Sequence, residues 1–359
     1  MIFGDVQLYN AHELVQGRMK DLLREDTIAR LKEVLPRLND SLDSDVSDGY
    51  CISRIPDGLR RTLNPLANYN GLATAGVELR FNRLASEASV TLCSSSGPQI
   101  VLVYQGCFVM AWYPVGVKPM TIPILPPESD QMALMQRITG ERDLPFDPDL
   151  TRIILPREVA RLVEIEGDLA LPRPGQTPSQ TCLFYGSSIT HGAHALRPTG
   201  SYAMRTAERL GVDCLNLGSG GGAHLEPQMA DYMAERDDWD FASLEMGINI
   251  LDIDNDDFAQ RVEYFVTRLA QAHPDKWIFC IDVFTSRNDL DNKEKVNAFR
   301  EIVRHQVESL NMPRLVYISG RDLLTSWDGL TCDLVHPAPA GMEQMADKLA
   351  ATMRHHMGW

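Results

Sequence analysis

At 359 residues, the chain is long enough for two domains, each able to bury a full hydrophobic core. Its composition, with 44% hydrophobic and 23% charged residues, is ordinary for a folded protein. The formal net charge of −15 argues against polyanionic partners, so we expect binding neither to nucleic acid nor to an anionic membrane surface.

The first half of the chain has the pattern of short antiparallel strands. Residues 75–81 and 88–92 alternate apolar with polar side chains, the period of a half-exposed strand. Residues 100–117 carry no charge, but Gln105-Gly106 divides them, which favours two buried strands and a turn over a membrane span. With a helical segment near 19–39, these strands predict a β-sandwich or jelly roll. Further strands are expected at 120–125, 152–155 and 160–165.

The second half has a different pattern. Residues 172–178 are rich in proline and resemble a linker, so we expect one domain over 1–175 and another over 176–359. Beyond the linker, strands alternate with long helices, which implies βαβ units, a parallel sheet and a site at the carboxyl edge of that sheet. The strands are expected at 181–185, 212–217, 241–246, 277–283 and 315–318, and the helices at 201–210, 257–272, 293–310 and from 339 onward.

Seven cysteines are scattered along the chain, often in apolar, strand-like runs. Their odd number and irregular spacing favour reduced, buried thiols over a disulfide framework. Met1–Asp5 lacks the basic segment and apolar core that begin a signal peptide. We therefore expect a cytoplasmic location. The cysteines are Cys51, Cys93, Cys107, Cys182, Cys214, Cys280 and Cys332.

Several cofactor and metal motifs fail on inspection. Residues 218–223 match the dinucleotide fingerprint G-x-G-x-x-A, but the acid at the right distance, Asp240, begins the next strand instead of ending it. Residues 252–263 resemble a calcium loop without its glycine, which is Asp257 here, so we expect these acids to cap a helix. H-E-x-x-H and paired C-x-x-C motifs are absent, which argues against a zinc enzyme.

Four other segments carry chemically useful residues at strand ends or in late loops. Ser188 follows the first strand of the second half, and the glycine-rich segment 216–222 follows the next. Asn249 comes after a third strand, and Asp333-Leu334-Val335-His336 lies near the C-terminus. This order of Ser, Gly, Asn and Asp-x-x-His resembles the four sequence blocks of the SGNH (GDSL-type) hydrolases, over roughly residues 180–355. The resemblance implies a flavodoxin-like α/β domain that follows the β-sandwich in the sequence.

The chemistry of these residue types explains why they occur together. Ser188 would attack an acyl carbonyl once His336 takes its proton, and Asp333 would fix the histidine tautomer and stabilise the imidazolium. The resemblance implies that the backbone N–H groups of Ser188 and Gly221 and the side-chain amide of Asn249 form an oxyanion hole. Loss of one such donor costs about 2.7–4 kcal/mol of transition-state stabilisation. Nothing in this mechanism requires a cofactor or a metal.

The chain departs from the family pattern at two positions. The usual Gly-Asp-Ser reads Gly186-Ser187-Ser188, and Asn249 is followed by Ile250 instead of Asp. Neither change removes a reacting atom, so we expect an active site. Three further histidines near the blocks receive no catalytic role: His191, His194 and His224.

Family members with an N-terminal β-sandwich are mostly esterases of acylated sugars, and some transfer acyl groups. We therefore expect a serine esterase, with acetylated carbohydrate as the specific substrate. We expect short-chain esters because no long apolar lid segment is visible. An acyltransferase using the same triad remains an alternative. A non-catalytic binding protein is a second alternative, although it would not need a triad. The N-terminal domain could bind substrate, wall one side of the cleft, or join two copies in a homo-oligomer.

Overall fold

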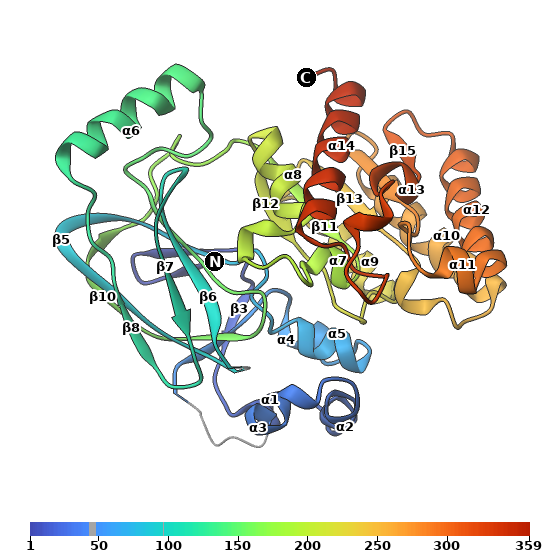
Figure 1. Ribbon diagram of the computed structural model, residues 1–359, viewed down its shortest axis with the longest axis horizontal. Helices are drawn as coiled ribbons and strands as arrows, with labels where there is room; N and C mark the ends of the chain where they lie inside the picture. The colour runs from blue at the N-terminus through green and yellow to red at the C-terminus, as the bar shows by residue number, and fades with distance from the viewer. Residues whose placement is uncertain (43–47, 96) are drawn as a thin grey trace. The chain divides into compact units, whose positions relative to one another are not determined.

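The computed structural model describes residues 1–42, 48–95 and 97–359 (Figure 1). The chain forms two compact units, Met1–Ser179 and Gln180–Trp359. Among the described residues, no helix combines the length and the apolarity that crossing a bilayer requires. All seven cysteines are free thiols, and most of them are buried.

The N-terminal unit is built on antiparallel strands, which confirms the expected domain of antiparallel β-structure. Its longest strand, β5, runs from Glu78 to Ser94 and pairs near its start with β2 and β9 and near its end with β8. β10 pairs with most of its length, from Asn82 to Ser94. The expected hairpin is also confirmed, because β6 pairs with β7 on either side of a turn at Gly106 and Cys107. The strands are β1 (Ile2–Phe3), β2 (Val6–Tyr9), β3 (Glu13–Val15), β4 (Tyr50–Ser53), β5, β6 (Gln99–Gln105), β7 (Phe108–Val115), β8 (Met120–Pro123), β9 (Thr151–Ile154) and β10 (Ala160–Ala170).

The period-two pattern of β5 accounts for the core of this unit. Leu79 and Phe81 are fully buried near its start, and Val90 and Leu92 are fully buried near its end. All four belong to one hydrophobic cluster to which the strands on both sides contribute. The strand therefore joins two parts of the sheet over a common core, as the alternation of residues predicts.

Short helices accompany these strands. The helical segment expected near residues 19–39 is confirmed, and its Leu31 and Leu38 pack in a second cluster with Tyr69. These helices are α1 (Met19–Leu22), α2 (Glu25–Val34), η1 (Pro36–Leu38), α3 (Asn39–Leu42), α4 (Asp57–Arg60) and α5 (Pro65–Asn70).

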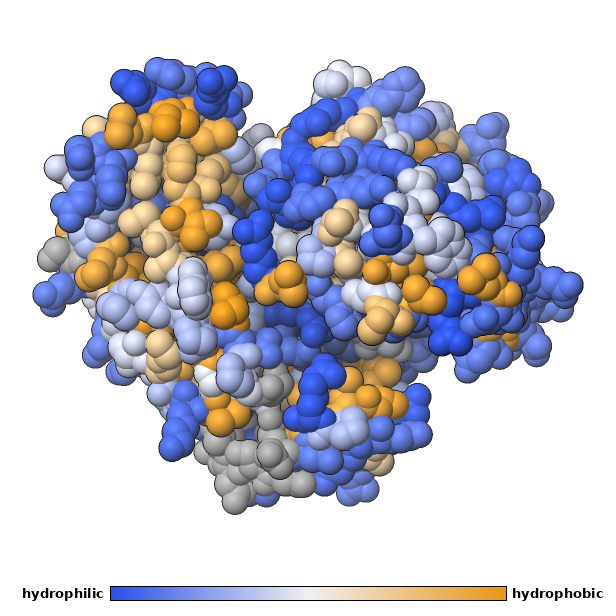
Figure 2. Space-filling model, viewed as in Figure 1, coloured by the Kyte–Doolittle hydropathy of each residue, from blue (hydrophilic) through white to orange (hydrophobic). Residues whose placement is uncertain are grey.

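One helix of this unit, α6 (Ser129–Arg142), was not predicted. None of its residues is buried, and Leu134 and Ile138 are 47% and 38% exposed. Figure 2 shows hydrophobic surface where this helix lies. The helix lacks the apolar stripe that packing on a core requires, so its sequence gives no periodic signal.

A buried ion cluster joins β5 to β9. Glu78 binds Arg152 (Oε1 to Nη2, 2.6 Å) and Arg80 (Oε2 to Nε, 2.8 Å), and all three side chains are nearly inaccessible to solvent. The Arg152 guanidinium also lies over the ring of Phe146, 3.4 Å from its centroid. Burial alone would raise the pKa of Glu78, but the charges of Arg152 and Arg80 outweigh it and lower this pKa to about 2.

The C-terminal unit contains a five-stranded parallel sheet in the order β12-β11-β13-β14-β15. This is the 2-1-3-4-5 order of flavodoxin-like folds, so the expected class is confirmed. After β11 the chain forms β12 on one side of it and then crosses to form β13 on the other side. The strand order therefore reverses direction between β11 and β13, and the carboxyl ends of these two strands form the topological switch point. The strands are β11 (Thr181–Tyr185), β12 (Asp213–Asn216), β13 (Phe241–Glu245), β14 (Trp277–Ile281) and β15 (Leu315–Ile318).

Helices cover both faces of this sheet, which is why four of its strands, β11 to β14, are almost wholly buried, whereas only Ile318 is buried in the edge strand β15. On one face, Phe184 and Phe241 pack against Tyr202 of α8 and Met345 of α14. On the other face, the ring of Tyr185 lies 4.7 Å from that of Phe265 in α10. The longer helices are α8 (Tyr202–Leu210), α9 (Pro227–Ala234), α10 (Asn255–Ala272), α12 (Lys293–Leu310) and α14 (Pro339–Met357). The shorter ones are α7 (Ser188–His191), η2 (Pro198–Gly200), η3 (Ile248–Ile250), α11 (Asn288–Asp291), α13 (Gly320–Leu323) and η4 (Trp327–Gly329).

The acids before α10 differ in detail from the expectation. The helix begins at Asn255, and the side chain of the preceding Asp254 makes no capping hydrogen bond. Asp256 and Asp257 lie in the first turn instead. There their negative charges interact favourably with the positive end of the helix dipole, without a side-chain cap.

Replacement of Glu78 by Gln should destabilise the N-terminal unit by about 3–5 kcal/mol, because two buried arginines would lose their counter-charge. Urea unfolding, followed by far-UV circular dichroism, measures this change. Glu33→Gln is the matched control, since Glu33 pairs with Arg30 at an exposed site. Equal unfolding midpoints for the two variants would contradict the assigned role of the cluster.

The same cluster predicts a dependence of stability on pH. The pKa of Glu78 is lower in the folded state than its ordinary value of 4.5. Its stabilisation is therefore present above pH 4.5 and is lost as the pH falls from there towards 2. The difference in unfolding free energy between wild type and Glu78→Gln should shrink over that interval.

Candidate active site

Ser188 lies where β11 ends and α7 begins. Ser187 caps the helix, because its Oγ accepts a hydrogen bond of 3.1 Å from the N–H of Ile189. Gly186 has no room for a side chain, since a Cβ there would lie 2.3 Å from Thr190 Oγ1 and 2.4 Å from an oxygen of Glu245. The turn from strand to helix is therefore tight, and it leaves Ser188 half-buried at the carboxyl edge of the sheet.

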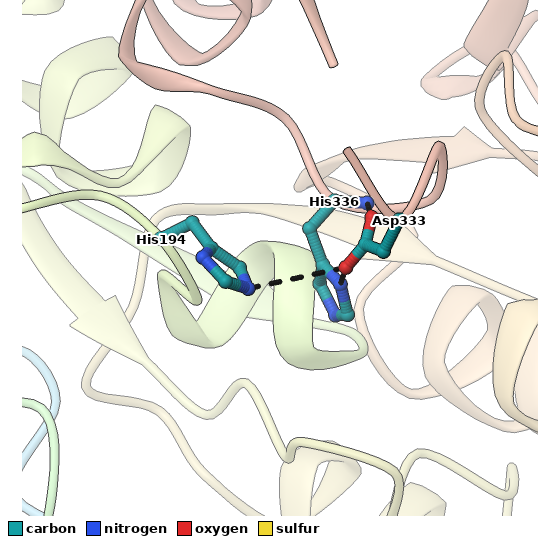
Figure 3. A group of neighbouring side chains, drawn as sticks. All are labelled: His194, Asp333 and His336. Atoms are coloured by element: carbon teal, nitrogen blue, oxygen red, sulfur yellow. Dashed lines mark hydrogen bonds and ion pairs between the residues drawn. The ribbon is translucent and has the colours of Figure 1, made fainter. Parts of the chain in front are cut away.

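The three residues predicted to form a triad lie in one hydrogen-bonded row. Ser188 Oγ is 2.7 Å from His336 Nε2, and His336 Nδ1 is 2.7 Å from Asp333 Oδ2. Figure 3 shows the Asp333 carboxylate against the ring of His336. A hydrogen on Nδ1 would be donated to the carboxylate and leave Nε2 to accept the serine proton. This geometry is the one that general-base activation of a serine requires.

The loop that carries Asp333 is held by its own backbone. The second carboxylate oxygen of Asp333 accepts hydrogen bonds from the N–H groups of Val335 (2.8 Å) and His336 (2.9 Å) and from Thr331 Oγ1 (2.9 Å). Partial burial would raise the pKa of Asp333, but these bonds and the His336 ring outweigh it and hold the pKa well below its usual value. Asp333 therefore stays ionised wherever a histidine can titrate.

The glycine-rich segment packs directly on the nucleophile turn. Asn216 joins the two, since its Oδ1 accepts from the N–H of Gly218 (2.8 Å) and its Nδ2 donates to Thr190 O (3.0 Å). A Cβ at Gly218 would lie 2.4 Å from the backbone nitrogen of His191, so only glycine fits there. Ser219 adds a bond from its N–H to Gly186 O.

Asn249 is linked to the same segment from β13. It lies in η3, and its Oδ1 accepts a hydrogen bond of 3.2 Å from the N–H of Ala223. The amide is thereby oriented with Nδ2 turned away from Ala223. Gly221 has a φ of 67°, the left-handed conformation that favours glycine. The roles of Ser188, Gly221 and Asn249 as oxyanion donors stay predictions.

Sequence reasoning missed the role of Glu245, the last residue of β13. Its Oε2 accepts hydrogen bonds from the N–H of Ser187 (2.5 Å) and from Thr190 Oγ1 (3.0 Å). The side chain is buried, and this burial raises the pKa of Glu245 although the bonds from Ser187 and Thr190 oppose it. An acid at a strand end is visible in the sequence, but its partners 55 and 58 residues away are not.

Two of the three unassigned histidines are wholly or partly buried. His224 Nε2 lies 3.0 Å from Gly221 O, and burial lowers the pKa of His224. His191 is buried within α7. The third, His194, lies beside Asp333 and His336 (Figure 3).

Comparisons with known proteins agree with this arrangement. A model of the GDSL-like lipase/acylhydrolase family matches residues 179–354. No curated protein sequence matches the chain. Among solved structures, the salicylyl-acyltransferase SsfX3 from a tetracycline biosynthetic pathway is similar with a TM-score of 0.73 at 18% identity, over 99% of this chain and 94% of that one.

Two family-two carbohydrate esterases are also similar in fold. The enzyme from Clostridium thermocellum has a TM-score of 0.59 at 16% identity, over 80% of this chain and 94% of its own. The enzyme from Cellvibrio japonicus has a TM-score of 0.56 at 17% identity, over 80% of this chain and 90% of its own. At these identities, the likeness shows the fold.

A parallel α/β sheet with a serine, a histidine and an aspartate hydrogen-bonded at its carboxyl edge is the arrangement of a serine-dependent hydrolase. The C-terminal domain, residues 179–354, belongs to the GDSL-like lipase/acylhydrolase family. Its enzymatic class is that of the SGNH-type ester hydrolases.

Replacement of Glu245 by Ala should leave the Ser187 N–H buried without an acceptor, which costs about 1–3 kcal/mol of stability. Because Ser188 would shift with the turn, kcat for an ester should fall roughly 100-fold. Glu245→Gln keeps a side-chain oxygen for the Ser187 N–H and should retain most of the activity. If both variants, measured as folded protein, show the wild-type kcat, Glu245 does not position the turn.

Proposed function

We propose that the C-terminal domain cleaves carboxylic esters through an acyl-enzyme on Ser188. The observation that supports this most directly is the row of hydrogen bonds from Ser188 to His336 and from His336 to Asp333. In the first step, Ser188 Oγ attacks the acyl carbonyl and its proton passes to His336 Nε2. Asp333 holds the Nδ1 hydrogen and stabilises the imidazolium, because its carboxylate is ionised.

The tetrahedral intermediate then collapses. The proton on His336 Nε2 passes to the oxygen of the leaving alcohol, and the acyl group remains on Ser188. Water then attacks the acyl carbon, with His336 again accepting a proton, and the serine is regenerated. In both halves, the negative oxygen would be bound by the N–H groups of Ser188 and Gly221 and by the amide of Asn249. The bond from Ala223 to Asn249 Oδ1 supports this role, since it orients the amide.

For the substrate, we propose a short-chain ester, with an acetylated carbohydrate as the specific case. The support is the likeness in fold to proteins named as carbohydrate esterases. All of the residues proposed for this hydrolysis lie in the C-terminal domain.

Acyl transfer to a hydroxyl acceptor is a second candidate. The observation that favours it is the likeness along 99% of this chain to a protein named as an acyltransferase, which includes the N-terminal half. The acyl-Ser188 step is the same in both functions. They differ only in whether water or an alcohol attacks the acyl carbon.

Ser188→Ala should lower kcat for p-nitrophenyl acetate by roughly 10⁴-fold or more, because it removes the hydroxyl on which the proposed acyl-enzyme forms. The matched control is the neighbouring serine. Ser187→Ala removes the cap of α7, worth about 1 kcal/mol of stability, and the side-chain hydrogen bond of Ser187 to Glu245. It should keep kcat within roughly tenfold of wild type. A Ser187→Ala enzyme that is folded and inactive, beside an active Ser188→Ala enzyme, would assign the nucleophile to the wrong serine.

The choice between water and an alcohol can be measured as a product ratio. With p-nitrophenyl acetate as donor and a panel of sugars as acceptors, a hydrolase should give acetate at the same rate with or without acceptor. Release of p-nitrophenol that accelerates with one acceptor, together with the acetylated sugar in the product, would favour transfer. Quantitative recovery of acetate at saturating acceptor would rule transfer out for that panel.

A further inference from the structure

His194 lies beside the carboxylate and the imidazole of the proposed triad. Its Nε2 is 3.9 Å from Asp333 Oδ2, and its ring centroid is 5.3 Å from that of His336 (Figure 3). One potential ligand atom from each of His194, Asp333 and His336 lies within 4.8 Å of the other two. The mechanism above uses Asp333 and His336 but leaves His194 without a task.

The loop after α7 holds His194 in this place. His194 has a φ of 62°, a left-handed conformation that few non-glycine residues adopt, and Gly192 and Leu196 on either side are also left-handed. The N–H of Ala193 donates a bond of 2.8 Å to the carbonyl oxygen of Ser188. The loop that carries His194 is thus hydrogen-bonded to the backbone of Ser188. Figure 3 shows the imidazole of His194 facing Asp333.

Two imidazole nitrogens and one carboxylate oxygen are a donor set that suits Zn²⁺ and similar transition metals. In a tetrahedral zinc site with bonds of about 2.0–2.2 Å, donor atoms lie roughly 3.3–3.6 Å apart. The measured separations from Asp333 Oδ2, 2.7 Å to His336 Nδ1 and 3.9 Å to His194 Nε2, lie on either side of that spacing. The side chains of His194 and Asp333 are 53% and 40% exposed, so small rotations can bring the donors to a common distance. Water would complete the coordination.

We propose that His194, Asp333 and His336 form an inhibitory site for a divalent transition metal of the Zn²⁺ type. The inhibitory effect rests on the proposed function, whereas the binding itself does not. When the metal binds His336 Nδ1, the hydrogen of that nitrogen moves to Nε2, and the ring stays neutral. Nε2 then carries a hydrogen and cannot accept the proton of Ser188, so the serine is not activated. The reaction itself needs no metal, and removal of the metal restores the original tautomer.

The donor set also predicts which metals act. Mg²⁺ and Ca²⁺ prefer oxygen ligands and should neither bind nor inhibit. Zn²⁺ should do both, because two of the three donors are imidazole nitrogens.

Calorimetric titration of the full chain with ZnCl₂ tests the site without relying on turnover. Wild type and Ser188→Ala should both bind, since Ser188 is not a ligand. His194→Asn should weaken binding roughly tenfold or more, and asparagine tolerates the left-handed backbone. Two controls address other surface donors: Cys332→Ser, because Cys332 is an exposed thiol, and a double His355→Ala/His356→Ala variant, because these exposed rings lie 5.4 Å apart on α14.

The expected result is a zinc affinity that falls in His194→Asn but not in either control. Where ester turnover is present, Zn²⁺ should inhibit wild type reversibly, with activity restored by EDTA, and should inhibit His194→Asn only at roughly tenfold higher concentration. Equal affinity in wild type and His194→Asn, or no binding at all, overturns the proposal. If zinc binds as expected but wild type has no esterase activity, the metal site stands and the proposed function fails.

Discussion

The hydrogen bonds from Ser188 to His336 and from His336 to Asp333 are the interaction on which the account of the C-terminal domain depends. Ser188 and His336 are 148 residues apart in the sequence, and their side chains meet at 2.7 Å. The parallel sheet makes this meeting possible, because it delivers the ends of β11 and β13 to one edge where late loops can reach them. The loop that carries Asp333 is held in turn by the three hydrogen bonds that one oxygen of its carboxylate accepts.

Buried carboxyl groups recur at this edge and fasten loops to strands. Glu245, at the end of β13, accepts the N–H of Ser187, and Asp282, directly after β14, accepts the N–H of Gly320 at 2.6 Å. Burial raises the pKa of Asp282 to about 6, although the bonds from Tyr317 and Gly320 oppose it. Each acid satisfies a backbone donor that would otherwise be buried without a partner. In the usual family pattern an Asp precedes the nucleophile, whereas here Ser187 caps α7 and the carboxyl group comes from the neighbouring strand.

The parts of this structure that the sequence predicted are those with local signals. The strands at 181–185 and 241–246 are apolar runs, and the triad residues belong to blocks that a family resemblance makes visible. The helix α6 has no such signal, because none of its residues is buried and no apolar stripe marks it. Contacts between residues far apart in the sequence could not be predicted either. Neither the bond from the Ser187 N–H to Glu245 nor the approach of His194 to Asp333 follows from spacing, since both depend on how separate loops meet at the edge of the sheet.

Mapping the adduct of a fluorophosphonate probe tests the central claim most directly. After labelling of the full chain, proteolysis and mass spectrometry locate the modified residue. The account predicts one adduct, on Ser188, and its loss in folded His336→Ala, because the serine would have no base. An adduct on another serine, or undiminished labelling of Ser188 in His336→Ala, would contradict the proposed row of Ser188, His336 and Asp333.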